Sequence, residues 1–357
     1  MSNFINKLWG SILIWIAATF LFGLIRMYGV DDLLLYDKAL EFSWTRFVLQ
    51  MLIMGLSVAI PFAILDYFLD NEWIRKRSYW GIILLNGSLQ VFLALGSVLA
   101  VGYVTQNILN KDLPVENAIN LGYLLSSETS ILWIVYSMII NYMIYFLKVV
   151  KSKIGDRILV NLLLGKYHYP REESRIFMFL DMKDSTTHGE NLGHIRFSAL
   201  IQDCFNDLTR AIISHNVEVY QYVGDEAVLT WKLEDGFKDA NCLKVYFTYM
   251  DSLKKRYQYY REKYQLEPFF KAGVHVGPVT VSEVGAIKRE IAYHSDVLNT
   301  AARIQGMCNQ FDSGLLISEE VKNRVDAPGD LAIEIIGGIN LKGKQLPVDI
   351  FKVEDSA

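Results

Sequence analysis

The chain has 357 residues and a formal net charge of −4, and 52% of its residues are hydrophobic. It lacks the basic stripe that marks nucleic-acid-binding proteins, so we predict no nucleic-acid partner. The three cysteines, Cys204, Cys242 and Cys308, have no paired spacing. That pattern argues against a disulfide framework or a zinc site and predicts buried free thiols.

The first part of the chain is dominated by long apolar stretches. Four uncharged runs of 18 to 25 residues occur there, and they are Leu8–Ile25, Phe47–Leu65, Trp80–Val104 and Thr129–Leu147. At 1.5 Å per residue, each run matches a hydrocarbon core of roughly 30 Å. We therefore predict a four-helix transmembrane domain over residues 1–147, embedded in a lipid membrane.

Basic residues indicate how these helices are oriented. Arg75, Lys76 and Arg77 crowd the loop after the second run, and four more basic residues follow the fourth run. The connection between the third and fourth runs holds only Lys111, although the first outer loop carries three basic residues. The distribution predicts a multi-pass protein of the inner (cell) membrane, with both termini and the soluble half in the cytoplasm.

Residues 148–174 form a predicted linker. Apolar residues recur every four positions at Val150, Ile154, Ile158 and Leu162, which predicts a helix that continues the fourth membrane helix. Such a helix either lies on its own domain or pairs with a second copy as a signalling helix, and the spacing fits both. The segment 165–174 is interpreted as a polar connection.

From Arg175 to Ala357, strand patterns alternate with helix patterns. We predict a buried strand over 175–181, a helix over 185–215, hairpins over 217–231 and 269–285, one long helix over 238–265, a helix over 297–307, a strand over 315–318, and closing strands within 331–353. This order predicts an α/β sandwich with a mixed sheet covered on one face.

Two acidic residues stand at the ends of neighbouring predicted strands. Asp181 ends the strand RIFMFLD, and Asp225 lies in the Gly-Asp-Glu turn of the first hairpin, from which Glu226 should point to the opposite face. Two carboxylates so placed are suited to hold the hard cations that phosphoryl transfer from a nucleoside triphosphate needs. The helix that opens at Ser185 and Thr186 favours anions at its N-terminus, although Ser185 serves equally well as an ordinary N-cap.

Four motifs occur in a fixed order: IFMFLDMKDSTTHGENLGH, VYQYVGDEAVLTW, AGVHVGPVTV and HSDVLNTAARIQ. Together they resemble the catalytic domain of the class III nucleotidyl cyclases, the adenylate and guanylate cyclase family. The likeness covers residues 175–353, about half of the chain. It implies a ferredoxin-like α/β domain and a membrane-bound adenylate cyclase that converts ATP into 3′,5′-cyclic AMP and pyrophosphate as a homodimer.

The resemblance also implies roles for particular residues. Asp181 and Asp225 would bind two Mg²⁺ or Mn²⁺ ions, assisted by the backbone carbonyl of Met182. Asn299 and Arg303, four apart and therefore on one helix face, would stabilise the transition state from the other protomer. Lys344 stands where the family binds the triphosphate, although Lys342 is only two residues away.

Two positions depart from the family pattern, and both concern the purine base. Many adenylate cyclases read adenine with a lysine and an aspartate or threonine at the positions that here hold Gln221 and Ala292. An amide both donates and accepts hydrogen bonds, but an alanine side chain does neither. A neighbour such as Tyr293 or Ser295 is a candidate substitute, so the choice between ATP and GTP stays open.

Other functions compete with this interpretation. The missing base-reading pair leaves a guanylate cyclase as the first alternative. Diguanylate cyclases also carry a Gly-Asp-Glu turn, but Val223 and Ala227 replace their second glycine and their aromatic residue. A catalytically silent, nucleotide-binding receptor would have little chemical reason to keep both acids together with the asparagine and the arginine. A transporter is disfavoured because the apolar runs carry no charge.

Overall fold

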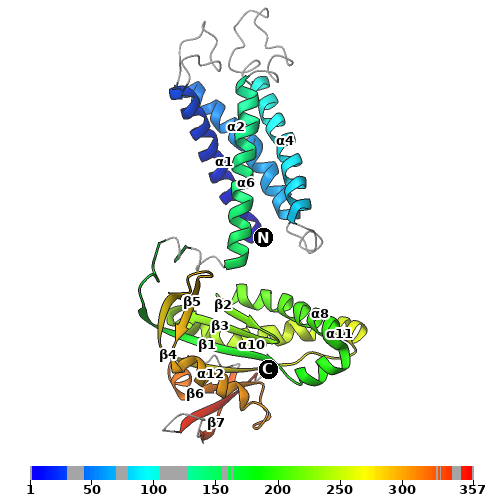
Figure 1. Ribbon diagram of the computed structural model, residues 1–357, viewed down its shortest axis with the longest axis vertical. Helices are drawn as coiled ribbons and strands as arrows, with labels where there is room; N and C mark the ends of the chain where they lie inside the picture. Colours follow the sequence, from blue (N-terminus) through cyan, green and yellow to red (C-terminus); the bar gives the residue numbers. More distant parts are fainter. Residues whose placement is uncertain are drawn as a thin grey trace, which may run out of the picture. The chain divides into compact units, whose positions relative to one another are not determined.

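The computed structural model describes residues 2–29, 44–69, 79–104, 128–154, 160–161, 164–326, 329, 331–339 and 347–355. The chain divides into two compact units, Met1–Val150 and Lys151–Ala357. Figure 1 shows the first unit as a set of long helices and the second as a sheet with helices packed on it.

The first unit is a bundle of four helices, which confirms the predicted fold of this half. The helices are α1 (Ser2–Gly29), α2 (Trp44–Leu69), α4 (Tyr79–Val104) and α6 (Glu128–Ile154). Each contains a span that is long and apolar enough to cross a membrane. Trp15, Met51 and Trp133 are buried in the bundle core, while large apolar side chains such as Phe92 face outward. Apolar residues on the outside as well as the inside are typical of helices that lie in lipid.

Hydrogen bonds between polar side chains join distant helices of the bundle. The Arg26 guanidinium at the end of α1 donates to Thr129 Oγ1 at the start of α6 over 3.0 Å. Between α6 and α4, Trp133 Nε1 donates to Ser97 Oγ over 2.8 Å. In an apolar bundle such bonds satisfy groups that have no access to water, and they fix the register of α6 against α1 and α4.

The fourth apolar run continues as a helix into the predicted linker. Helix α6 runs past Leu147 to Ile154 without a break. Ile158 and Leu162, which complete the predicted apolar repeat, lie outside the described residues. The basic residues at positions 75–77 and 111, on which the predicted orientation depends, are also outside them.

The second unit is built on one mixed sheet. Its strands are β1 (Arg171–Met182), β2 (Glu218–Val223), β3 (Glu226–Lys232), β4 (Phe270–Val284), β5 (Glu290–His294), β6 (Leu315–Ser318), β7 (Leu331–Ile339) and β8 (Val348–Asp355). Their order is β2-β3-β1-β4-β6-β8-β7, with β5 paired to β4, and among the strands that the structure describes only β4 and β6 pair in parallel. The inner order β4-β1-β3-β2 is the ferredoxin-like arrangement that the resemblance to the cyclases implied.

Helices cover the sheet on both faces, so the prediction of a single covered face is wrong. The helices of this unit are α8 (Ser185–Ser214), α9 (Leu233–Phe237), η3 (Lys238–Ala240), α10 (Asn241–Lys254), α11 (Tyr257–Tyr264), α12 (Asp296–Gly306) and α13 (Glu319–Lys322). Alternate side chains of β1 point to the two faces of the sheet. Ile176 and Met178 share a core with α8 and α10, whereas Phe177 packs with Val297 and Ala301 of α12.

Two further predictions of local structure are wrong. The long helix over 238–265 is interrupted at Arg256, which leaves helical geometry and forms an ion pair with Asp207 of α8. The Tyr260 hydroxyl donates to the same carboxylate over 2.6 Å, so α11 is held against α8. The segment 269–285 is not a hairpin, because β4 runs unbroken for 15 residues and turns only at Gly285, where φ is +90°.

Candidate active site

Two carboxylates meet where β1 and the β2–β3 hairpin end. The β1–β3 ladder finishes with Asp181 opposite Glu226, so the turn that holds Asp225 lies beside the end of β1. Gly224 precedes Asp225 with φ of +61°, a conformation that glycine adopts without steric penalty. The predicted pair of acids is therefore brought together by the end of one strand and the turn of its neighbour.

The environment of Asp181 is electrostatically crowded. Burial, followed by the charge and hydrogen bonding of Asp225, raises the pKa of Asp181 to about 6. Asp225 Oδ2 is buried and has no hydrogen-bond partner within the described part of the chain. A buried acceptor without a donor, next to a second carboxylate, is the environment that a divalent cation relieves.

Glu226 belongs to the same cluster, so the prediction that it points to the opposite face is wrong. Residues directly opposite in an antiparallel ladder project to the same face, and Glu226 lies opposite Asp181. Burial and the charges of both aspartates raise the pKa of Glu226 to about 7. Strand alternation does not apply to Asp225, because it stands in the turn and not in the strand.

Two residues that were not predicted from the sequence stabilise the charged form of Asp181. Gln305 Nε2 of α12 donates to Asp181 Oδ2 over 3.2 Å, and Lys271 of β4 lies opposite Asp181 across the β1–β4 ladder. Both act to lower the pKa of Asp181. Lys271 is 7% exposed, and its ammonium donates to Asn309 Oδ1 over 3.1 Å. Their signals in the sequence were a lysine inside an apolar strand and a glutamine on the buried side of a helix.

Helix α12 approaches the sheet closely because β4 has a glycine beneath it. A Cβ atom on Gly273 would lie 2.2 Å from the backbone nitrogen of Gln305 and 2.6 Å from the carbonyl oxygen of Ala301. No side chain fits between the two backbones at this point. The missing Cβ therefore lets Gln305 reach Asp181.

Asn299 and Arg303 lie on the other side of the same helix. At 100° per residue, Arg303 is rotated by about 160° from Gln305, whereas Asn299 is only about 40° from Arg303. Asn299 is exposed, and Arg303 Nη1 has no hydrogen-bond partner within the described ranges, with Asp296 Oδ1 4.0 Å away. The pair thus shares one face, as predicted, and that face is turned away from the protomer's own Asp181.

Three more of the predicted residues stand at the end of β1 and the start of α8. Ser185 and Thr186 stand in the first turn of α8, four and five residues after Asp181, and the N-cap Asp184 makes no side-chain capping bond. The side chain of Met182 is in the hydrophobic core, so only its backbone is available to a ligand. Lys344 and its neighbour Lys342 lie outside the described residues.

Gln221 and Ala292 lie on β2 and β5, and the proposed substitutes for Ala292 have other tasks. The Ser295 hydroxyl donates to the carbonyl of Pro278 over 2.8 Å and caps α12. The Tyr293 ring packs against Phe177 and Tyr220, with centroids 5.3 Å and 5.0 Å away. Gln221 itself is exposed and free of these contacts.

Comparison with known proteins decides the family. Residues 168–354, just over half of the chain, match the family described as "Adenylate and Guanylate cyclase catalytic domain". The chain belongs to this cyclase family. The match includes both acids, Gln305, and the Asn299–Arg303 pair.

Individual relatives agree with this assignment. The chain is 28% identical over 211 residues to "Adenylate cyclase 2" of Rhizobium meliloti (strain 1021), covering 59% of this chain and 58% of that protein. It is 23% identical over 187 residues to "Adenylate cyclase" of Anabaena cylindrica, covering 50% of this chain and 36% of that protein. The chain thus spans about a third to three fifths of the length of these relatives.

A solved structure shows the same fold. The structure of a bacterial light-regulated adenylyl cyclase matches with a TM-score of 0.55 and 17% identity, covering 65% of this chain and 68% of that chain. At this identity the likeness concerns the fold alone.

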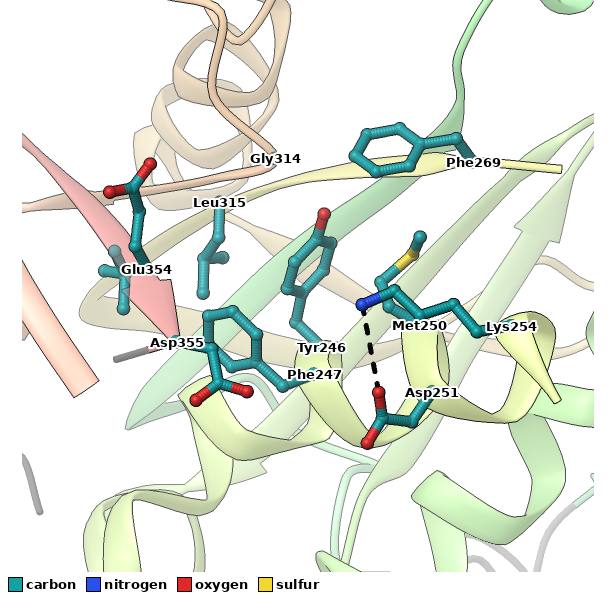
Figure 2. Close-up of a pocket in the computed structure, with 11 residues that line it drawn as sticks. Tyr246, Phe247, Met250, Asp251, Lys254, Phe269, Gly314, Leu315, Glu354 and Asp355 are labelled. Atoms are coloured by element: carbon teal, nitrogen blue, oxygen red, sulfur yellow. Dashed lines mark ion pairs between the residues drawn. The ribbon is translucent and has the colours of Figure 1, made fainter. Parts of the chain in front are cut away.

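The cyclase domain also has a pocket whose lining includes neither Asp181 nor Asp225. It has a volume of about 450 Å³ and lies between α10 and the ends of β6 and β8, lined by side chains that include Tyr246, Met250 and Leu315. Figure 2 shows Lys254 and Asp251 paired at its rim. None of the predicted site residues lines it, and the Tyr246 hydroxyl already donates to the carbonyl of Phe270. The pocket is therefore separate from the predicted site residues.

Proposed function

We propose that the chain is a membrane-bound adenylate cyclase that converts ATP to 3′,5′-cyclic AMP and pyrophosphate with two Mg²⁺ or Mn²⁺ ions at a homodimer interface. The observation that carries the proposal is the pairing of Asp181 with Asp225 on one surface and of Asn299 with Arg303 on another. The names of the two relatives support the choice of reaction.

The arrangement of α12 supports a site shared by two protomers. Gln305 contacts Asp181 of its own chain, and the same helix turns Asn299 and Arg303 away from it. A two-fold dimer would place this outward face opposite the carboxylates of the other protomer, giving two equivalent sites. The membrane helices would hold the two copies at high effective concentration.

The residues fit a divalent cation without a complete protein cage. Within the described part of the chain, no three His, Cys, Asp or Glu side chains are arranged so that they could hold a metal ion by themselves, so triphosphate oxygens and water would supply the other ligands. When bound, the ions would neutralise the triphosphate and lower the pKa of the ribose 3′-hydroxyl. Asp181 and Asp225 hold the negative charge that attracts them, and Gln305 fixes the orientation of the Asp181 carboxylate.

The remaining groups would position the nucleotide for in-line attack of the 3′-oxygen on the α-phosphorus. Arg303 would stabilise the charge that develops on the α-phosphate, and Asn299 would orient the ribose. Amides of the first turn of α8, at Ser185 and Thr186, would bind phosphate oxygens. Fixed donors directed at developing charge supply most of the catalysis in such transfers.

GTP is the alternative substrate. Ala292 offers no side-chain hydrogen bond, and Tyr293 and Ser295 are engaged elsewhere, so Gln221 is left as the base-reading side chain. An amide can pair with either purine edge, since it both donates and accepts. A guanylate cyclase therefore follows if Gln221 pairs with guanine.

The test uses the full chain, purified in detergent and supplied with Mn²⁺ and either ATP or GTP. We expect cyclic AMP and pyrophosphate in equal amounts from ATP, and loss of both in Asp181→Asn. Glu190→Gln, which removes an exposed carboxylate from the first half of α8, serves as the matched control and should retain activity. Formation of cyclic GMP alone would favour the guanylate cyclase alternative. If neither nucleotide gives a cyclic product, the catalytically silent receptor is the hypothesis that survives.

A further inference from the structure

Arg175 is a buried cation that connects three strands. Its side chain is 1% exposed in β1, on the same face of the strand as Phe177. The guanidinium donates to Glu218 Oε2 of β2 over 2.8 Å and to Glu173 Oε2 of β1 over 3.2 Å. It also lies 5.5 Å from the centre of the Tyr293 ring of β5. A planar group with several donors and an aromatic-compatible face suits this combination of partners.

The strands joined by Arg175 carry the two base-reading positions. Tyr220 of β2 and Tyr293 of β5 contact each other, with centroids 5.0 Å apart, and each precedes or follows a base-reading position by one residue. Those positions are Gln221 and Ala292. Strands β2 and β5 do not pair with each other, because β3, β1 and β4 separate them in the sheet. Side-chain contacts across the face, and not backbone hydrogen bonds, therefore set the distance between them.

The same network reaches the segment that leads into β1. Glu173 accepts from Lys166 Nζ over 2.7 Å and from the Tyr167 hydroxyl over 3.1 Å. Tyr167 is 2% exposed, and its carbonyl accepts from the Glu283 amide over 2.9 Å. The last part of the predicted linker is thus attached through Glu173 to Arg175.

We propose that Arg175 is a positioning residue that sets the separation of β2 and β5 and thereby the selectivity of the site between adenine and guanine nucleotides. The proposal rests on the proposed function, because it concerns the nucleotide of that same site. Removing the guanidinium leaves Glu218 and Glu173 without their shared partner on the buried face, and β2 then relaxes away from β5. Gln221 moves with β2, so its bond to the purine changes. Asp181 at the far end of β1 and Asp225 in the hairpin turn stay in place, because the β1–β3 ladder, which ends with Asp181 opposite Glu226, holds that end of the hairpin.

The experiment compares the purified full chain with Arg175→Met, Arg175→Lys and Glu218→Gln. Selectivity is measured twice, as the ratio of kcat/KM for ATP and GTP and as the ratio of Kd for fluorescent N-methylanthraniloyl ATP and GTP. Arg171→Met is the matched control, since Arg171 is an exposed arginine at the start of the same strand. Mn²⁺ binding, measured by electron paramagnetic resonance of the free ion, reports on Asp181 and Asp225.

We expect Arg175→Met to change both nucleotide ratios by about tenfold, the range set by a lost or misplaced hydrogen bond to the base. Arg175→Lys should not restore them, and Mn²⁺ affinity and the Arg171→Met variant should match the wild type. A merely structural role would lower activity with both nucleotides equally, and unchanged ratios would overturn the proposal. Should Arg175→Met fail to fold, Glu218→Gln decides by the same criterion. Binding ratios remain measurable without turnover, so failure of the proposed function is seen separately.

Discussion

Gly273→Ala is the substitution whose effect follows most directly from the structure. The added Cβ would lie 2.2 Å from the Gln305 nitrogen and 2.7 Å from the Gln305 Cα, and backbone atoms cannot rotate out of the way. Restoring the first contact to the 3.4 Å of ordinary van der Waals packing requires α12 to move away from β4 by about 1.2 Å. That displacement stretches the 3.2 Å hydrogen bond between Gln305 and Asp181 beyond hydrogen-bonding distance.

The expected magnitude has two parts. Overpacking at one position lowers the free energy of unfolding by about 1–3 kcal/mol. A 1 Å misplacement of groups that position a substrate reduces kcat by about 100-fold. We therefore expect Gly273→Ala to lower both the melting temperature and the rate of cyclic nucleotide formation, with weaker Mn²⁺ binding.

The matched control lies in α12 itself. A Cβ on Gly306 would have no heavy atom within 4 Å, so Gly306→Ala should leave activity unchanged and the melting temperature equal or higher. Thermal denaturation and a fixed-time assay with Mn²⁺-ATP measure both properties. Wild-type stability and kcat in Gly273→Ala would refute the claim that the close approach of α12 holds the site together.

Three further outcomes follow. The pKa of Asp181 is raised to about 6 and that of Glu226 to about 7, so protons compete with Mn²⁺ for these carboxylates. The apparent affinity for Mn²⁺ should therefore decrease as the pH is lowered below about 7, in titrations followed by paramagnetic resonance. The raised values also mean that the folded, metal-free protein binds more protons than the unfolded chain. The stability contributed by these carboxyls is full below about pH 4 and lost as pH rises through 6 and 7. Asp181→Asn should therefore raise the melting temperature of the metal-free protein near pH 7.5, and a lower value would contradict the repulsion inferred here. Asn299→Ala should lower kcat by about 100- to 1,000-fold with little change in Mn²⁺ binding, as loss of one transition-state donor does.

Much of the fold followed from periodicity. The four apolar runs, the strand ending at Asp181 and the hairpin around Asp225 are local patterns, and local patterns predict the elements they form. The prediction of a hairpin over 269–285 failed because Gly273 and Gly277 resemble turn residues. Their role is to allow α12 to pack closely on β4. That role depends on α12, which begins 19 residues after Gly277 and 23 residues after Gly273, and no local window contains both partners.

Only some residues of the candidate site were predicted from the sequence. Asp181 and Asp225 were found because each stands at a strand end, and Asn299 and Arg303 because their motif has a fixed spacing. Lys271, Gln305 and Arg175 were missed, since each looks like an isolated polar residue in an apolar element. Only the tertiary structure shows that the first two face Asp181 and that the third joins β1 to β2 and β5.

The central claim is that two protomers build each site, and co-expression of Asp225→Ala with Arg303→Ala tests it most directly. Each variant alone should be inactive, since every site in its dimer lacks either a metal ligand or the arginine. In a mixed dimer one of the two sites has both, so the purified mixed dimer should have about half of the wild-type activity. The measurement is cyclic AMP formed by the co-purified pair, isolated through two different affinity tags. Activity at that level supports the shared site, and an inactive mixed dimer of two folded variants would contradict it.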